Sequence, residues 1–175
     1  MEGSTDAGSL LEPLRAAGGR AYLGEPVTVL EHSLQAAALA EAEERTPEIV
    51  VAALLHDVGW LLHGGPRAHD RRGALHLARH FGPEVVEPVR LHVEAKRYLV
   101  AAEPSYRARL SSASIRTLAL QSGPMAGAEV ETFMETPFAA DAVALRQLDD
   151  RAKVPWTSTP ALDHYVALVE SLLIS

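Results

Sequence analysis

The chain of 175 residues contains no cysteine, which excludes disulfide bonds and thiolate metal ligands alike. Such a chain is compatible with a reducing compartment, and we expect a cytoplasmic protein. No apolar run is long enough to cross a bilayer and the first residues show no secretion signal, so no membrane contact is expected. Basic side chains are outnumbered, with a formal net charge of −7, which argues against nucleic acid as a partner.

Aromatic residues make up only 5% of the chain, whereas apolar residues reach 47%, with alanine and leucine abundant. This composition favours helices that pack through small and aliphatic side chains. No segment alternates polar and apolar residues over a useful length, so no sheet is expected. We therefore predict an all-α protein in which residues 1–175 form one helical domain, long enough to bury a sizeable core.

Glycine and proline divide the helical pattern into segments. Thr28 and Thr46 are N-cap candidates, and Pro47 suits a first helical turn. Pro88 lies inside a predicted helix and should kink it or mark its true start. Helices are expected at residues 5–17, 28–44, 48–63, 69–81, 84–102, 105–122 (one or two helices), 126–135, 138–152 and 160–173.

The pair His56-Asp57 stands inside the most apolar of these segments, residues 48–63. A buried carboxylate is costly unless a cation, a metal ion or hydrogen bonds accompany it. Neighbouring helical residues point about 100° apart, so one metal ion could bind both side chains, or the aspartate could bridge to a second ion. The pair alone is equally consistent with a core histidine bonded to a carbonyl and an aspartate that caps another helix.

Three further histidines and an aspartate strengthen the metal interpretation. His32 lies on the preceding helix, His69 starts a helix, His92 is in mid-helix, and Asp149 ends an apolar face. Imidazole and carboxylate together suit iron, manganese, cobalt, zinc or nickel. Each residue alone is more often structural, but together they predict a metal centre.

The order of these residues along the chain resembles the HD-domain superfamily in its two-metal form. The resemblance implies a helical HD-domain bundle and two metal ions that share one bridging aspartate. By the same resemblance, the ligands are His32, His56, Asp57 and Asp149 for one ion, and Asp57, His69 and His92 for the other.

Asp149 is preferred to its neighbour Asp150 as the last ligand. It stands four residues before Lys153, as in an Asp-x-x-x-Lys pattern of related oxygenases, and one turn after Arg146. Asp150 is then expected to be a solvated charge.

Longer stretches are similar to one branch of this superfamily, the oxygenases with a mixed-valent diiron centre. Within that branch the chain resembles the glycine-forming 2-amino-1-hydroxyethylphosphonate dioxygenases and related hydroxyphosphonate oxygenases. The resemblance implies two iron ions as Fe(II)/Fe(III), dioxygen as co-substrate, and cleavage of the C–P bond of a 1-hydroxy(2-amino)alkylphosphonate to a carboxylate and inorganic phosphate. The matching stretches are residues 22–32, 92–99, 111–125 and 145–153.

Two other functions stay open at this stage. A metal-dependent HD phosphohydrolase acting on a small phosphate ester or nucleotide would use the same ligands, with a metal-activated water and no oxygen. A regulatory module would bind a phosphorylated ligand without turning it over. The long matching stretches favour the oxygenase, and the complete ligand set disfavours the regulatory module.

Helical spacing places cations beside two of the expected ligands. Lys96 follows His92 by four residues and Arg146 precedes Asp149 by three, so each pair shares a helix face. The alternative for both cations is a salt bridge on a solvated face. Charge combined with hydroxyl and amide groups would suit a phosphonate dianion. The expected substrate contacts are Lys96, Ser114, Thr117, Gln121 and Arg146.

Three residues are expected to shape access to the pocket. The resemblance implies that Tyr22 and Glu25, in the loop before the His32 helix, close over the metal site and move aside for substrate. The alternative for this loop is a surface turn with a packed tyrosine. Trp60 stands where many relatives carry histidine or lysine, so it removes a polar contact or favours an apolar or quaternary ammonium end through cation–π contact. The sequence does not indicate an oligomeric state.

Overall fold

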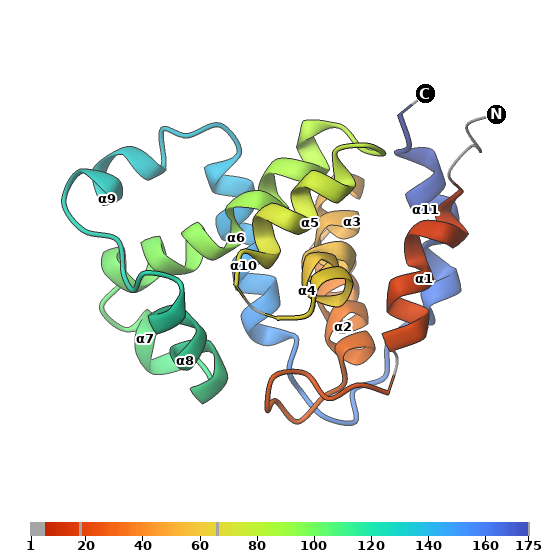
Figure 1. The fold of residues 1–175 in the computed structure, drawn as a ribbon, viewed down its shortest axis with the longest axis horizontal. Helices are drawn as coiled ribbons and strands as arrows, with labels where there is room; N and C mark the ends of the chain where they lie inside the picture. The colour runs from red at the N-terminus through yellow and green to blue at the C-terminus, as the bar shows by residue number, and fades with distance from the viewer. Residues whose placement is uncertain (1–5, 18, 66, 175) are drawn as a thin grey trace.

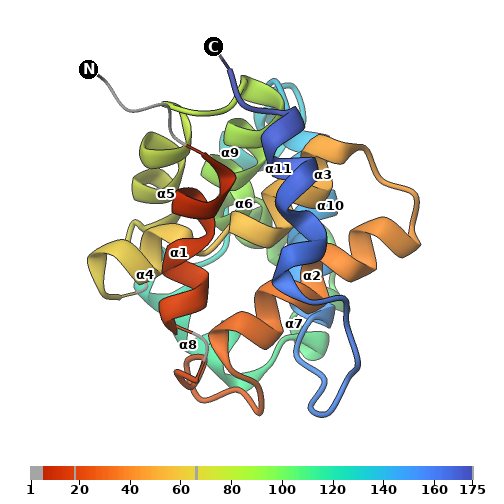
Figure 2. The ribbon, with the colours of Figure 1, turned by 90° about the vertical axis from the view of Figure 1, so that its right-hand side faces the viewer.

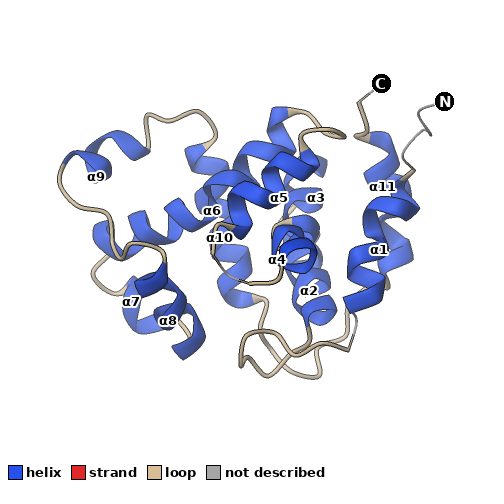
Figure 3. Ribbon diagram, in the orientation of Figure 1, coloured by secondary structure: helices blue, strands red, loops and turns tan. Residues whose placement is uncertain are grey.

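The computed structural model describes residues 6–17, 19–65 and 67–174, and its fold is all-α, as predicted (Figures 1 and 3). Across these residues there is no strand, and the two β-bridges are isolated. None of the described helices is both long and apolar enough to span a membrane. The elements are α1 Ala7–Ala17, α2 Val29–Ala42, α3 Pro47–Leu55, α4 Val58–His63, α5 His69–Leu77, α6 Pro83–Ala102, α7 Tyr106–Arg109, α8 Ser112–Leu120, α9 Ala128–Phe133, α10 Ala139–Arg151, a 3₁₀ turn Leu162–Tyr165 and α11 Val166–Ser171.

The long helix α6 runs through the middle of the molecule and packs against α3, α5 and α10 (Figure 1). On one side of it lie α7, α8 and α9. On the other side, α1 and α11 pack side by side, with α1 against α2 and α4, and α11 against α3 (Figure 2). The largest apolar cluster joins α1, α2, α3 and α11 to α5, α10 and the start of α6. The helices that carry the candidate ligands therefore surround one common interior.

Two predicted N-caps fix where α2 and α3 begin. The Glu31 amide donates to Thr28 Oγ1 over 3.2 Å, and the Glu31 carboxylate accepts from the Thr28 amide over 2.7 Å, which completes a capping box. Thr46 caps α3 with its side chain, and Pro47 occupies the first turn. Because both helices start at defined residues, His32 and the end of α3 are held in a fixed register.

The segment expected as one helix at residues 48–63 is two helices, α3 and α4, which is a correction to the prediction. The break falls at the His56-Asp57 pair, where Asp57 has φ −98° and ψ 9°. The apolar pattern continues through the break, so no local pattern indicates where the helix is interrupted. Beyond the break, α4 packs so closely on α5 that a Cβ at Gly59 would lie 2.0 Å from the His69 carbonyl oxygen.

The other differences concern helix ends and short breaks. Residues 105–122 form two helices, and residues 160–173 begin with the 3₁₀ turn before α11. Helix α6 starts at Pro83 and includes Pro88, so Pro88 does not mark its start. Helix α5 ends at Leu77, earlier than expected. The predicted start of the first helix at residue 5 lies outside the described residues.

The variant Gly59→Ala is predicted to destabilise the fold by about 3 kcal/mol. The added methyl group would collide with backbone atoms of α5, which cannot move aside as a flexible side chain can. Gly8→Ala in α1 is the matched control, because its Cβ would meet only the Asp6 side chain, at 3.4 Å. Alanine there should stabilise the helix by roughly 0.5–1 kcal/mol. Urea unfolding followed by circular dichroism measures both, and equal stabilities would contradict the close packing of α4 on α5.

Candidate metal centre

Six predicted ligands, which lie far apart in the sequence, meet in the interior between α2, α5, α6 and α10. Asp57 and His56 come from the junction of α3 and α4, and His69 is the first residue of α5. All six side chains are buried, with exposed fractions between 0% and 8%. They are His32, His56, Asp57, His69, His92 and Asp149.

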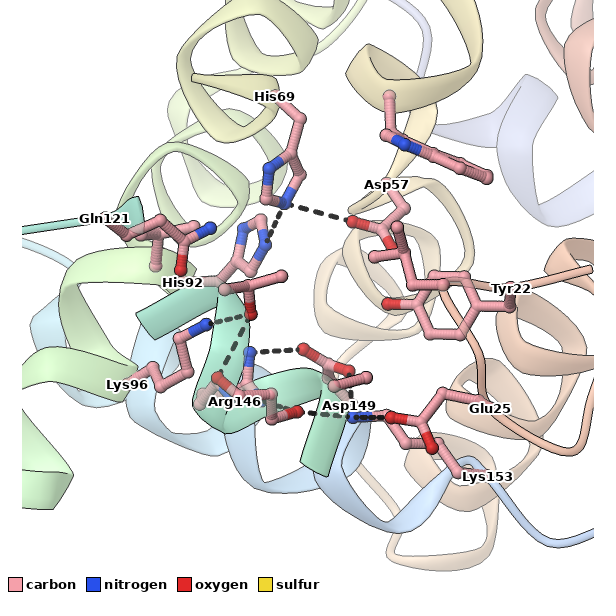
Figure 4. Close-up of a pocket in the computed structure, with 16 residues that line it drawn as sticks. Tyr22, Glu25, Asp57, His69, His92, Lys96, Gln121, Arg146, Asp149 and Lys153 are labelled. Carbon is pink, nitrogen blue, oxygen red and sulfur yellow. Dashed lines mark hydrogen bonds and ion pairs between the residues drawn. The ribbon is translucent and has the colours of Figure 1, made fainter. Parts of the chain in front are cut away.

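The ligand atoms form two groups, within each of which every atom lies within 4.8 Å of the others. The first group is His32, His56 and Asp149, and the second is Asp57, His69 and His92. In the first, the Nε2 atoms of His32 and His56 are 3.1 Å apart. In the second, the Nε2 atoms of His69 and His92 are 3.0 Å apart. Figure 4 shows the second group at the edge of a pocket.

Hydrogen bonds to the other ring nitrogen orient three of these histidines. Nδ1 of His32 donates to the Ala152 carbonyl oxygen over 2.8 Å, His56 donates likewise to Ala53 over 2.8 Å, and His92 to Val89 over 2.6 Å. Burial lowers the pKa of His56. Burial also lowers the pKa of His92, and the neighbouring His69 lowers the pKa of His92 further. A neutral ring that donates from Nδ1 presents a bare lone pair on Nε2. The Nε2 atoms are therefore arranged to bind a cation.

Asp57 stands between the two groups and reaches both. Its Oδ1 is 3.1 Å from His69 Nε2, and its Oδ2 is 3.5 Å from His56 Nε2 and 3.9 Å from His32 Nε2. Burial opposes ionisation of Asp57, but the neighbouring His56 and His69 hold its pKa well below the usual range. The carboxylate thus offers one oxygen to each group, as a bridging ligand must.

Two carboxylate oxygens in this interior, Asp57 Oδ2 and Asp149 Oδ1, have no hydrogen-bond partner among the described residues. Burial opposes ionisation of Asp149 too, but Arg146 and Lys153 hold its pKa well below the usual range. A buried ionised oxygen without a partner is costly, and a metal ion removes that cost. Two nitrogens bound at right angles to one ion, at about 2.1 Å each, lie about 3 Å apart, which matches the observed pairs. The residues present therefore fit two metal ions of the first transition row.

A pocket opens onto the second group and is lined by several cations (Figure 4). Lys96 is only 2% exposed and its Nζ donates to Thr117 Oγ1 over 3.0 Å. Burial, followed by the nearby Arg146, lowers the pKa of Lys96 to about 7. The five expected substrate contacts all line this pocket, namely Lys96, Ser114, Thr117, Gln121 and Arg146.

Sequence reasoning missed Lys153 as a pocket residue. Its Nζ lies 3.1 Å from Ser114 Oγ, 3.5 Å from Asp149 Oδ1 and 3.9 Å from Glu25 Oε1. The spacing Asp-x-x-x-Lys contained the signal, but it served only to select Asp149 over Asp150. Lys153 is thus a further cation beside the metal ligands.

The expectation that Asp150 is a solvated charge is wrong. Its carboxylate accepts hydrogen bonds from Arg146 Nη2 and from the Tyr106 hydroxyl, and its side chain is only 14% exposed. Tyr106 itself was not singled out from the sequence. It comes from α7, and no local pattern relates that helix to α10.

Tyr22 and Glu25 lie over the site, in the loop before α2. The Tyr22 ring stacks on His32 with centroids 4.1 Å apart and planes 15° apart. Burial and the neighbouring Asp57 raise the pKa of Tyr22 well above its usual range, so its hydroxyl stays protonated. Glu25 accepts a hydrogen bond from the Ser111 hydroxyl. The loop therefore covers the first ligand group from the pocket side.

Trp60 also lines the pocket and stands edge-on to Tyr22, with centroids 6.1 Å apart. The Arg20 guanidinium lies over the indole, 5.9 Å from its centroid. One cation thus already contacts the ring, although Arg20 does not itself line this pocket. The expected pocket position of Trp60 is the one observed.

Removing one ligand of the second group is predicted to lower the metal content by one ion per chain. His92→Ala takes away a ligand of that group and leaves the first group intact, so the bound iron or manganese should fall from two ions to about one. His80→Ala, outside both groups, is the matched control and should keep the full content. Inductively coupled plasma mass spectrometry after anaerobic loading gives the stoichiometry. Equal metal content in the two variants would contradict the assignment.

Comparison with known proteins agrees with this geometry. A family model described as HD domain matches residues 29–119. The chain is 41% identical over 165 residues to a [1-hydroxy-2-(trimethylamino)ethyl]phosphonate dioxygenase (glycine-betaine-forming) of Leisingera caerulea, covering 89% of this chain and 84% of that protein. It is 44% identical over 165 residues to a hydroxymethylphosphonate dioxygenase of Gimesia maris, covering 89% and 82%. An uncharacterised protein of Acanthamoeba polyphaga mimivirus is 35% identical over 160 residues, covering 85% and 73%. The resemblance expected from the sequence is confirmed, and the chain belongs to the HD-domain family.

Proposed function

We propose that this protein is an iron- and oxygen-dependent enzyme that cleaves the C–P bond of a 1-hydroxyphosphonate, giving a carboxylate and inorganic phosphate. The observation that carries the proposal is the convergence of Lys96, Arg146 and Lys153 in one pocket beside the two ligand groups. The two similar dioxygenases support it, since both names give a hydroxyphosphonate as the substrate.

The pocket residues bind and orient the phosphonate. Lys96 and Lys153 supply positive charge, and the hydroxyl groups of Ser114 and Thr117 lie next to them. The Gln121 side-chain oxygen is buried without a hydrogen-bond partner among the described residues, so it is available to accept from a donor on the substrate. Charge combined with several directed donors is what a dianion needs. Fixed in this way, the substrate carbon is held beside the ligand groups.

Two iron ions in the mixed Fe(II)/Fe(III) state, held by the two groups, would supply dioxygen activation and oxidation of the substrate carbon. The loop of Tyr22 and Glu25 controls access to them. The space left in the pocket for water-sized molecules is only about 30 Å³, little more than a water molecule or two requires. The closed loop therefore leaves no room for a phosphonate, which enters when the loop moves aside, and it excludes bulk water.

Coupled oxygen uptake and phosphate release test the proposal directly. The protein is loaded anaerobically with Fe(II), partly oxidised, and given hydroxymethylphosphonate or a 2-amino-1-hydroxyethylphosphonate. Cleavage of a 1-hydroxyphosphonate by one dioxygen molecule balances as one carboxylate and one phosphate, so the two signals should be equal. A phosphate ester is offered in parallel. Its hydrolysis without oxygen and with Mg²⁺ in place of iron, together with no phosphate release from the phosphonates, would instead establish a phosphohydrolase.

The charge of Lys96 is predicted to control substrate affinity. Lys96→Met should raise KM about 10- to 100-fold, since it removes a charge-assisted hydrogen bond. Because the pKa of Lys96 is lowered to about 7 in the free protein, its ammonium is charged below that pH and neutral above it. KM should therefore rise with pH above 7. Lys96→Arg keeps the charge at every pH and should flatten this rise, whereas an unchanged pH profile would contradict the role.

Trp60 is predicted to set the preference for the substrate's amine end. Trp60→Ala should change the ratio of kcat/KM between trimethylammonium and primary amine substrates by about tenfold, the size of a desolvated cation–π contact. The value for hydroxymethylphosphonate, which has no amine, serves as the internal reference. Arg20→Ala distinguishes the effect of Arg20 from that of the substrate's ammonium group, because it removes the guanidinium that already contacts the indole. An unchanged ratio in both variants would exclude Trp60 from substrate selection.

A further inference from the structure

The guanidinium of Arg146 lines the pocket but is also held by several protein partners, and its side chain is only 5% exposed. Nη1 lies 2.7 Å from Asp149 Oδ2, and Nη2 is bonded to Asp150. Nη2 also lies 3.4 Å from Ser114 Oγ, and Nε lies 3.4 Å from the Tyr106 hydroxyl. Most of the N–H groups of Arg146 are therefore committed within the protein.

The partners of Arg146 divide into two sides. Asp149 and Ser114 belong to the pocket, where Asp149 turns Oδ2 to Arg146 and Oδ1 toward His32 Nε2, at 3.3 Å. Asp150 and Tyr106 line a separate cavity on the outer surface. The Tyr106 hydroxyl donates to Asp150 Oδ2, which closes a triangle of hydrogen bonds with Arg146.

A single ion pair with Asp149 would leave the plane of the guanidinium free to rotate about the Nη1 contact. Asp150 binds Nη2 on the opposite side, and the Tyr106 hydroxyl contacts Nε. Contacts at Nη1, Nη2 and Nε together fix the plane of the guanidinium. Arg146, Asp149 and Asp150 also share one helix, α10, at spacings of three and four residues. The orientation of Arg146 therefore depends on Asp150. Asp150 does not line the pocket, and its other charged neighbour, Lys153 of the pocket, lies farther away, with Nζ 3.9 Å from Asp150 Oδ1.

We propose that Asp150, supported by Tyr106, is a positioning residue that fixes the Arg146 guanidinium against both the Asp149 carboxylate and the bound phosphonate. Asp150 acts mainly through Arg146, which is its nearest cation, while Lys153 lies at 3.9 Å. The proposed positioning of Asp149 assumes that Asp149 is a metal ligand. The proposed contact with the phosphonate rests on the function proposed above. Loss of the Asp150 charge should leave Arg146 in place but loosely held, so that anion binding weakens.

The test is binding of inorganic phosphate to anaerobic, Mn²⁺-loaded protein by isothermal titration calorimetry, which needs no turnover. Asp150→Asn keeps the size of the side chain but removes its charge, and it should weaken phosphate binding about tenfold. Asp150→Glu restores the charge and should bind more tightly than Asp150→Asn. Asp141→Asn is the matched control, because it makes the same change at an exposed position of α10 and should bind phosphate as the unaltered protein does.

A double-mutant cycle shows whether Asp150 acts through Arg146. In an Arg146→Met background, Asp150→Asn should cause little further loss of phosphate affinity, because only the 3.9 Å contact with Lys153 remains. An equal loss in both backgrounds would overturn the proposal, as would unchanged affinity in Asp150→Asn. If Asp150→Asn does not fold, Tyr106→Phe replaces it in the cycle and should weaken binding a few-fold, again only when Arg146 is present.

The readout also separates this proposal from the oxygenase assignment. Non-additive effects on phosphate binding, without oxygen uptake on any hydroxyphosphonate, would support the positioning role and reject the oxygenase. Oxygen uptake together with additive effects on phosphate binding would support the oxygenase and reject the positioning role. In an active enzyme, Asp150→Asn should raise KM more than it lowers kcat, because the residue does not touch the reacting atoms.

Discussion

Two carboxylate oxygens, buried among four imidazole rings, impose the constraint on which the rest of the site depends. Asp57 Oδ2 and Asp149 Oδ1 have no hydrogen-bond partner among the described residues, while paired Nε2 atoms face each other at 3.0 and 3.1 Å. Without metal ions, both of these desolvated carboxylate oxygens would remain without a hydrogen bond. With two metal ions the same atoms become a ligand set, and Asp57 joins its two halves.

A few local features of the helices bring these side chains together. The break between α3 and α4 places Asp57 at a junction rather than in mid-helix. The close approach of α4 to α5 at Gly59 brings His69, the first residue of α5, to 3.1 Å from Asp57. On α10, one helical turn carries Arg146, Asp149 and Asp150, so the same segment supplies a ligand, a cation and the support of that cation. The candidate metal ligand and the proposed anion contact therefore lie on the same helical segment.

The features that could be predicted from the sequence are those that depend on the spacing of nearby residues. The all-α fold followed from composition and periodicity, and the buried His56-Asp57 pair marked a polar point in an apolar segment. The helix break at that pair was not readable, because the apolar pattern runs through it. The contact of Tyr106 with Asp150 was hidden too, since it joins residues 44 positions apart. Asp150 was misjudged because an isolated acidic residue beside a ligand gives no local sign of burial.

Anomalous diffraction from crystals of the iron-loaded protein would show whether two metal ions share Asp57. Data collected at the iron absorption edge should give two peaks about 3.5–4 Å apart, one near His32, His56 and Asp149 and the other near His69 and His92, with Asp57 between them. A single peak, or two peaks that do not flank Asp57, would contradict the account.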